Sequence, residues 1–168
     1  HTLERIFTRL KRNDIRIDRA RMDCGSCTEE IVDTVKAHCN HFYIRANRCS
    51  AFYDEMFILR GWRTEEINGI EFELNSIVVE KWKGKPYRLV IQRQKRTDNI
   101  QEIWEGEYIY RCILTNDFES DVREIVEFYN LRGGKERIFD DMNNGFGWKR
   151  LPMSFMSENT VYLLMTAL

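Results

Sequence analysis

The first third of the chain alternates between helix-period and strand-period apolar patterns. Apolar residues recur at i, i+3, i+4 and i+7 over residues 2–13, which predicts an amphipathic helix. Residues 15–22 follow with the pattern of a strand covered on both faces. A turn then leads to a second predicted helix over 28–39, capped by Ser26, and to a strand over 42–46. Helix, strand, helix, strand is the order of an α/β layer fold.

The middle of the chain has short β-branched and aromatic runs separated by turn residues, and we interpret residues 52–108 as an inserted β-rich subdomain. Three runs in and next to it predict strands, at residues 77–79, 87–91 and 108–114. A helix capped by Ser120 is expected to run through Tyr129. The remaining expected elements are helices over 132–142 and 157–168, with a glycine-rich loop over 143–147 between them.

Composition limits the class of protein. The chain has 168 residues, of which 43% are apolar, so it is long and apolar enough to close a core. Lys and Arg total 26 against 27 for Asp and Glu, so net charge alone does not indicate a nucleic-acid or membrane partner. No run approaches the roughly 18 to 20 apolar residues of a membrane span. Five cysteines, an odd number, favour reduced thiols. We therefore expect a soluble, cytoplasmic protein.

Two carboxylates are candidate site residues. Asp23 follows the first predicted strand, and ligands of open α/β sheets bind at the carboxyl ends of strands. The alternative for Asp23 is a capping or turn aspartate. Tyr129, Arg132 and Glu136 are three and four residues apart, so a continuous helix would place them on one face. The alternative for that group is an ordinary surface salt bridge.

The densest positive charge lies between residues 81 and 96, where seven cations occur without an acid. Trp82 and Tyr87 are interleaved with them, which is typical of nucleic-acid contact. The alternative is the solvated face of an edge strand protected by cations. Residues 5–21 hold seven more cations, which we expect to point in several directions. The candidate DNA-contacting residues of the first stretch are Lys81, Lys83, Lys85, Arg88, Arg93, Lys95 and Arg96.

Cys24, Cys27, His38 and His41 offer a competing arrangement, because two thiolates and two imidazoles can hold a tetrahedral zinc ion. The two histidines have only two residues between them, below the usual three to five, so the spacing disfavours this site. A Cys24 nucleophile with a histidine base is also disfavoured, since no oxyanion site or orienting acid accompanies it.

The order of these features resembles the bacterial insertion-sequence transposases that have a ribonuclease H-like catalytic domain and an Asp-Asp-Glu metal triad. One subgroup is marked by Tyr, two residues, Arg, three residues, Glu, six residues and Lys, matched here by Tyr129, Arg132 and Glu136. The second Asp of such enzymes lies in Arg-x-Asp-x-Gly, matched by Arg21–Gly25. Two further segments are similar to the family, residues 114–117 before the Tyr-bearing helix and residues 147–159 after the Glu.

The resemblance implies an α/β fold of the ribonuclease H-like type, a mixed sheet flanked by helices. It implies a β-rich insertion between the second catalytic Asp and the catalytic Glu. The core would then comprise residues 1–51 and 109–168, and the insertion residues 52–108.

The resemblance also implies an activity, metal-dependent strand cleavage and strand transfer at transposon ends. Asp23 and Glu136 would bind two Mg²⁺ or Mn²⁺ ions, as phosphoryl transfer at a diester requires. Tyr129 and Arg132 would contact DNA near the cleaved strand. The implied partners are double-stranded DNA, both transposon ends and target, and a second copy of the enzyme in a homodimer.

Two features depart from the family pattern. The Lys position of the signature holds Asn143, and the first Asp of the family belongs to a strand that would precede residue 1. We therefore expect residues 1–168 to be a partial catalytic domain that is inactive alone. The alternatives are a non-enzymatic DNA-binding module, a zinc-stabilised interaction domain and a degenerate transposase remnant. For the transposase, we expect a bacterial cytoplasmic protein that associates with the nucleoid when bound to DNA.

Overall fold

The computed structural model of the chain describes residues 2–46, 52–95, 108–131, 134–148, 150 and 152–166. The chain forms two compact units, residues 1–129 and residues 130–168. No helix among the described residues is long and apolar enough to cross a membrane.

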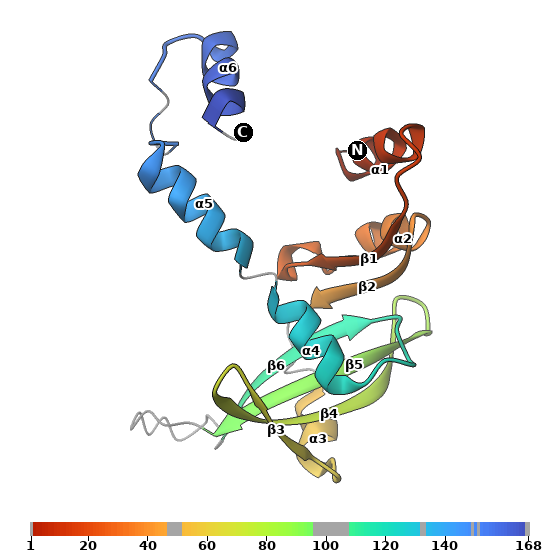
Figure 1. Cartoon of the computed structure of the whole chain (residues 1–168). Coiled ribbons are helices and arrows are strands. Elements are labelled where there is room, and N and C mark those ends of the chain that lie inside the picture. The colour runs from red at the N-terminus through yellow and green to blue at the C-terminus, as the bar shows by residue number, and fades with distance from the viewer. Residues whose placement is uncertain are drawn as a thin grey trace. The chain divides into compact units, whose positions relative to one another are not determined.

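The first unit is built on one six-stranded mixed sheet with the strand order β1-β2-β6-β5-β4-β3 (Figure 1). β1 and β2 are parallel, and every other neighbouring pair is antiparallel. The strands are β1 (Ile17–Met22), β2 (Cys39–Arg45), β3 (Arg63–Ile67), β4 (Ile70–Lys81), β5 (Lys85–Lys95) and β6 (Tyr108–Thr115). The predicted α/β architecture, a mixed sheet flanked by helices, is confirmed.

Helices cover both faces of this sheet. Phe7, Val32 and Met56 belong to one buried cluster, so their helices share one face. Ile125 and Val126 belong to a second cluster on the other face. In Figure 1 the helix with these two residues crosses in front of β5 and β6. The helices of the unit are α1 (Thr2–Arg12), α2 (Glu29–Lys36), α3 (Tyr53–Ile58) and α4 (Val122–Asn130).

The first third of the chain folds as its periodicity predicts, apart from the cap of α2. Thr28 is the N-cap, because its side chain accepts a hydrogen bond from the Ile31 backbone N–H at 3.4 Å. The Ser26 hydroxyl instead lies 3.4 Å from Oδ1 of Asp23. The expected cap at Ser26 was therefore wrong. Cys39 begins β2 instead of ending the helix.

The strands of the β-rich middle join the same sheet as β1 and β2. β5 lies between β4 and β6, so the alternative reading of this stretch as an edge strand was wrong. Neither β3 nor α3 was predicted from the sequence pattern. β3 pairs with β4 through a tight turn in which Asn68 and Gly69 both have positive φ angles, 54° and 76°. An Asn-Gly pair is the usual signal of such a hairpin, although the charged residues of β3 obscure it. The assignment of residues 52–108 as an insertion stays a prediction.

The second unit contains α5 (Gly134–Gly145) and α6 (Met156–Thr166). α5 extends to Gly145, so the predicted loop over 143–147 begins too early. Asn159 is buried and joins α6 to the preceding segment, with its side chain bonded to both the N–H and the carbonyl of Met153, at 3.0 and 2.8 Å. The Tyr162 hydroxyl donates to the Phe146 carbonyl.

Candidate active site

The parallel pair β1 and β2 brings two strand ends to one edge of the sheet. Asp23 follows β1 in extended conformation, with φ −80° and ψ −179°, and its side chain is exposed. Its backbone carbonyl accepts a hydrogen bond from the Ser26 N–H at 3.2 Å, which starts the short turn over Cys24–Ser26. The turn holds the backbone of Asp23 while leaving its carboxylate at the sheet edge.

The end of α4 lies against this same edge. The Tyr129 hydroxyl donates a hydrogen bond to the Met22 carbonyl at 3.0 Å, one residue before Asp23. Arg21 donates from Nη1 to the Phe128 carbonyl at 2.5 Å, and its guanidinium lies 4.9 Å from the centre of the Phe128 ring. These contacts join residues more than one hundred positions apart in the sequence. The segment with Asp23 and the segment with Tyr129 therefore meet in the fold.

Arg45 is a further residue of this edge, which the sequence pattern did not single out. It ends β2, and because Met22 pairs with Ile44, Arg45 is the register neighbour of Asp23. Its guanidinium lies 5.1 Å from the centre of the Tyr129 ring. Its Nη1 is buried without a hydrogen-bond partner among the described residues. The sequence shows only a cation near the end of a predicted strand, and its place beside Asp23 follows from the register between β1 and β2.

The other end of α4 is held by a buried carboxylate. Asp117 is only 2% exposed. It accepts hydrogen bonds from the Tyr43 hydroxyl at 2.6 Å and from the backbone N–H groups of Ser120 and Glu119 at 2.9 and 3.1 Å. The helix itself is capped by Asp121, whose Oδ1 accepts from the Arg123 N–H at 2.9 Å, and the expected cap at Ser120 was wrong.

Burial and hydrogen bonding oppose each other at Asp117. Burial by itself raises the pKa of this carboxyl, but the bonds from Ser120, Tyr43 and Glu119 outweigh burial and hold the pKa well below its ordinary value. Burial, followed by the bond to Asp117, raises the pKa of the Tyr43 phenol. The pair is therefore a carboxylate and a neutral phenol at neutral pH, which suits a fixed structural contact.

Tyr129 and Glu136 of the Tyr, Arg and Glu signature lie in two different helices. Tyr129 is in α4 and is 4% exposed. Arg132 lies outside the described residues. Glu136 is in the first turn of α5, and its side chain lies outside the described part. Tyr129 and Glu136 lie in two separate helices, as the expected helices through Tyr129 and over 132–142 implied, because α4 ends at Asn130 and α5 begins at Gly134. The pairing of Asp23 with Glu136 stays a prediction.

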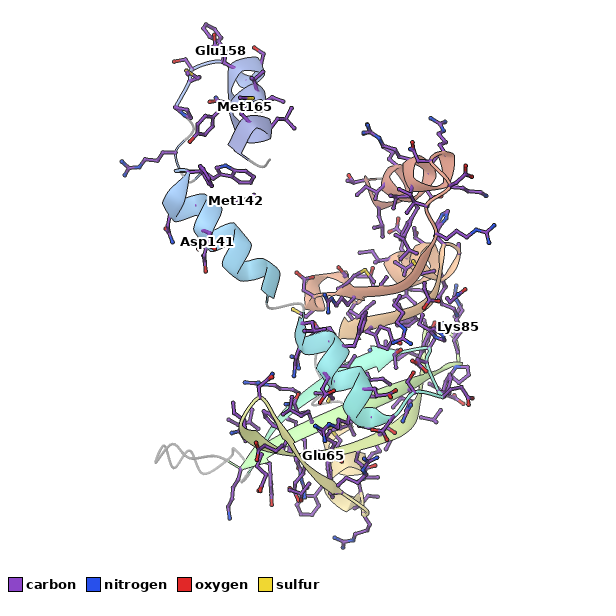
Figure 2. The ribbon with its side chains drawn as sticks, in the orientation of Figure 1. Glu65, Lys85, Asp141, Met142, Glu158 and Met165 are labelled. Carbon is purple, nitrogen blue, oxygen red and sulfur yellow. The ribbon has the colours of Figure 1, made fainter. Side chains whose placement is uncertain are left out.

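Three cations of the basic stretch over residues 81–96, Lys83, Lys85 and Arg93, lie next to acids of the same unit. Lys85 lies 3.1 Å from Asp33 and 3.5 Å from Glu29, both on α2, and Figure 2 shows Lys85 near the start of β5. Lys83 lies 3.7 Å from Glu29, with a side chain that is 83% exposed. The ammonium of Lys81 lies over the Trp82 ring at 5.3 Å.

The arginines of this stretch point to opposite faces of the sheet. Arg88 donates to the Ser120 carbonyl at 2.6 Å, on the α4 face. Arg93 pairs with Glu73 at 2.7 Å and lies 3.8 Å from the centre of the Trp62 ring. Arg96 lies outside the described residues. These cations do not share one surface, although Lys83 and Lys95 are exposed. DNA contact by this stretch stays a prediction.

The alternative zinc site is not assembled by the fold. Cys24 and Cys27 follow the carboxyl end of β1, whereas His38 precedes β2 at the end that pairs with Ile17. The length of β1, about 17 Å at 3.3 Å per residue, separates the cysteines from His38. Zinc binds sulfur at about 2.3 Å and nitrogen at about 2.1 Å, so one ion cannot join them. His38 instead stacks on Phe7 at 4.8 Å.

The carboxylate of Asp23 is the type of ligand that a hard divalent cation prefers. Asp23 is exposed at a strand end, and Mg²⁺ and Mn²⁺ prefer carboxylate oxygens as ligands. Among the described residues, no three His, Cys, Asp or Glu side chains form a metal-binding group. The described side chains alone therefore do not complete a metal site at Asp23.

A mixed sheet flanked by helices, with an aspartate at the end of a parallel strand, is the architecture of ribonuclease H-like phosphoryl-transfer domains. Comparison with protein families finds one matching model, described as a transposase DDE domain, over residues 1–168. The chain therefore belongs to the family of transposase DDE domains. No curated protein matches the chain significantly. Enzymes of this family act on DNA and use divalent metal ions.

Proposed function

We propose that this chain is the catalytic part of an insertion-sequence transposase that cleaves DNA at transposon ends and transfers the strand to target DNA. The observation that carries the proposal is the bond between the Tyr129 hydroxyl and the Met22 carbonyl at 3.0 Å. This hydrogen bond joins the segment with Asp23 to the segment with Tyr129, and a transposase of this kind needs these two motifs side by side. Family membership supports the same conclusion.

We assign the metal-binding role to Asp23 and Glu136. Two bound Mg²⁺ or Mn²⁺ ions would activate the attacking oxygen and stabilise the leaving oxygen of the phosphodiester. Asp23 offers oxygens from the end of β1, and Glu136 would offer them from the first turn of α5. Neither carboxylate needs to form a covalent bond to DNA.

We assign phosphate contact to the cations around Asp23. Arg45 is the register neighbour of Asp23 and is only partly buried, so its guanidinium is the proposed donor to a phosphate oxygen at this edge. Arg132 follows α4 closely in sequence and would serve the same purpose. Tyr129 would contact phosphate only by exchanging its present bond to Met22, so its first role is to position α4. Transposon-end and target duplexes are the proposed substrates, handled by a homodimer.

The experiment uses a supercoiled plasmid with Mn²⁺ or Mg²⁺, and it compares residues 1–168 joined to an upstream strand that carries the first Asp of the triad with the D23N and E136Q variants of the same protein. Both substitutions remove a negative charge while keeping side-chain size. We expect each to abolish metal-dependent nicking, at least a hundredfold, while DNA binding is retained. E127Q is the matched control, because Glu127 is an exposed carboxylate on α4 paired with Arg123 at 2.9 Å.

Two results would contradict the proposal. Nicking that persists in D23N or E136Q would separate these carboxylates from the chemistry. DNA binding without cleavage in any divalent cation, unchanged by either substitution, would favour a DNA-binding module or a degenerate remnant.

A further inference from the structure

The exposed face of α1 holds three arginines in one row. Arg5, Arg9 and Arg12 are four and three residues apart, so at 3.6 residues per turn they fall within roughly 60° of the helix circumference. All three are exposed. Lys11 lies about 100° around the helix from Arg12, so the cations of residues 5–21 point in several directions, as expected, while these three share one face. We name Arg5, Arg9 and Arg12 the arginine stripe.

Packing fixes the direction of the arginine stripe. Phe7, on the opposite side of α1, is 6% exposed and stacks on His38 at 4.8 Å. Leu3 and Leu10 pack against the same buried cluster. Because these residues hold α1 by its apolar side, the stripe faces away from the sheet.

The arginine stripe is not neutralised within the described part of the protein. Glu4 is the acid of α1, and it lies 3.4 Å from the His38 ring nitrogen. The three guanidinium groups make no hydrogen bond or ion pair with another described side chain. Lys85 and Arg93 of the basic stretch, by contrast, pair with acids at 3.1 and 2.7 Å. The stripe is therefore the better electrostatic site for an external anion.

The shape of the surface favours an extended polyanion. Glu4 and Thr8 complete, with the arginine stripe, a shallow hollow of about 440 Å³. The three arginines span about 10 Å along the helix, at 1.5 Å per residue. One strand of duplex DNA carries a phosphate every 3.4 Å of helix axis, so this length faces several phosphates. Guanidinium groups are well matched to phosphate oxygens.

We propose that the arginine stripe of α1 binds the phosphate backbone of duplex DNA away from the cleaved bond. This inference rests on the proposed function for the identity of the partner. α1 precedes the amino end of β1, and Asp23 follows its carboxyl end, about 20 Å away at 3.3 Å per residue. The strand alone therefore spans the length of about six base pairs. The stripe would orient the flanking duplex toward Asp23.

The test measures binding of a fluorescent 30-base-pair duplex of random sequence at several salt concentrations, for the full chain and for R5A/R9A/R12A. Each phosphate contact contributes about 0.9 to the slope of log affinity against log salt. We expect the triple variant to lower the magnitude of the slope by about 2.7, and R9A alone by about 0.9. R5K/R9K/R12K keeps the charges and should retain most of the slope.

The matched control is R60A/R111A/R150A, which removes the same charge from exposed arginines elsewhere. Its slope should stay within about 0.9 of the wild-type slope. An unchanged slope in the stripe variant, or an equal loss in the control, would overturn the proposal. The readout is independent of Asp23 and Glu136, so D23N should bind with the wild-type slope even if the catalytic assignment fails.

Discussion

Asp117 and Asp23 show that the surroundings of an aspartate determine its role. Asp117 is buried and accepts three hydrogen bonds, and burial together with those bonds fixes it as a structural carboxylate. Asp23 is exposed at the end of a parallel strand, where its oxygens can take external ligands. The sequence pattern singled out Asp23 from its place after a strand. Asp117 also follows a strand, so position alone does not separate the two.

Asp117→Asn should destabilise the protein by about 2 kcal/mol at pH 7, because charge-assisted hydrogen bonds become neutral ones. The pKa of Asp117 is lowered in the folded state, so its stabilising effect is present above the unfolded value, about 3.9, and is lost as pH falls below it. Urea unfolding at pH 7 and pH 3 measures both variants. The difference between them should shrink by about 1 kcal/mol at pH 3. An equal difference at both pH values would contradict this assignment.

At the scale of elements, α4 connects the middle of the sheet to the edge with Asp23. Its first turn is tied to β3, where Glu65, labelled in Figure 2, pairs with Arg123 at 3.0 Å. Its last turn is tied to β1 through Tyr129 and Arg21. A helix fixed at both ends holds a constant position against the strand end. It therefore keeps the end of α4 beside the segment that carries Asp23.

Tyr129→Phe tests this connection, because it removes one hydroxyl and keeps the ring under Arg45. We expect a loss of about 1 kcal/mol in the free energy of unfolding. In the protein with the added upstream strand, we also expect slower metal-dependent nicking with unchanged DNA affinity, since α4 would lose an anchor beside Asp23. E127Q on the same helix should change stability by less than about 0.5 kcal/mol. Wild-type nicking by the Phe variant would show that the bond is structural only.

The spacing of apolar residues correctly predicted the helices that bury one face against the sheet. Residues 2–13 and 122–129 alternate polar and apolar side chains with helical spacing, and both form helices packed on the sheet. β3 was missed because its Arg and Glu residues carry no apolar alternation, and its pairing depends on the turn at Asn68 and Gly69. Caps at Ser26 and Ser120 were wrong, since neighbouring Thr28 and Asp121 compete for the same helix ends.

At the scale of the molecule, the candidate site was predicted in its sequence motifs but not in its supporting contacts. Asp23 and Tyr129 were both singled out, and the fold joins their segments. Arg45 was missed because its relevance depends on the register between β1 and β2. The distribution of charge along the sequence predicted the candidate site least well. Seven cations cluster in the sequence between residues 81 and 96, but in the fold acids from α2 and β4 lie next to Lys83, Lys85 and Arg93.

The central claim is that Asp23 and Glu136 bind the same metal ions, and iron-directed cleavage tests it without requiring enzymatic activity. Fe²⁺ takes the place of Mg²⁺ at such oxygen sites. With peroxide, bound Fe²⁺ generates hydroxyl radicals that cut the polypeptide next to the metal, and mass spectrometry locates the cuts.

We predict cuts beside Asp23 and beside Glu136 in the same sample, both suppressed by excess Mg²⁺ or Mn²⁺ and both lost in D23N and in E136Q. The E127Q control should keep both cuts. Cleavage at only one of the two positions, or cuts at Asp23 that survive in E136Q, would contradict the shared metal site.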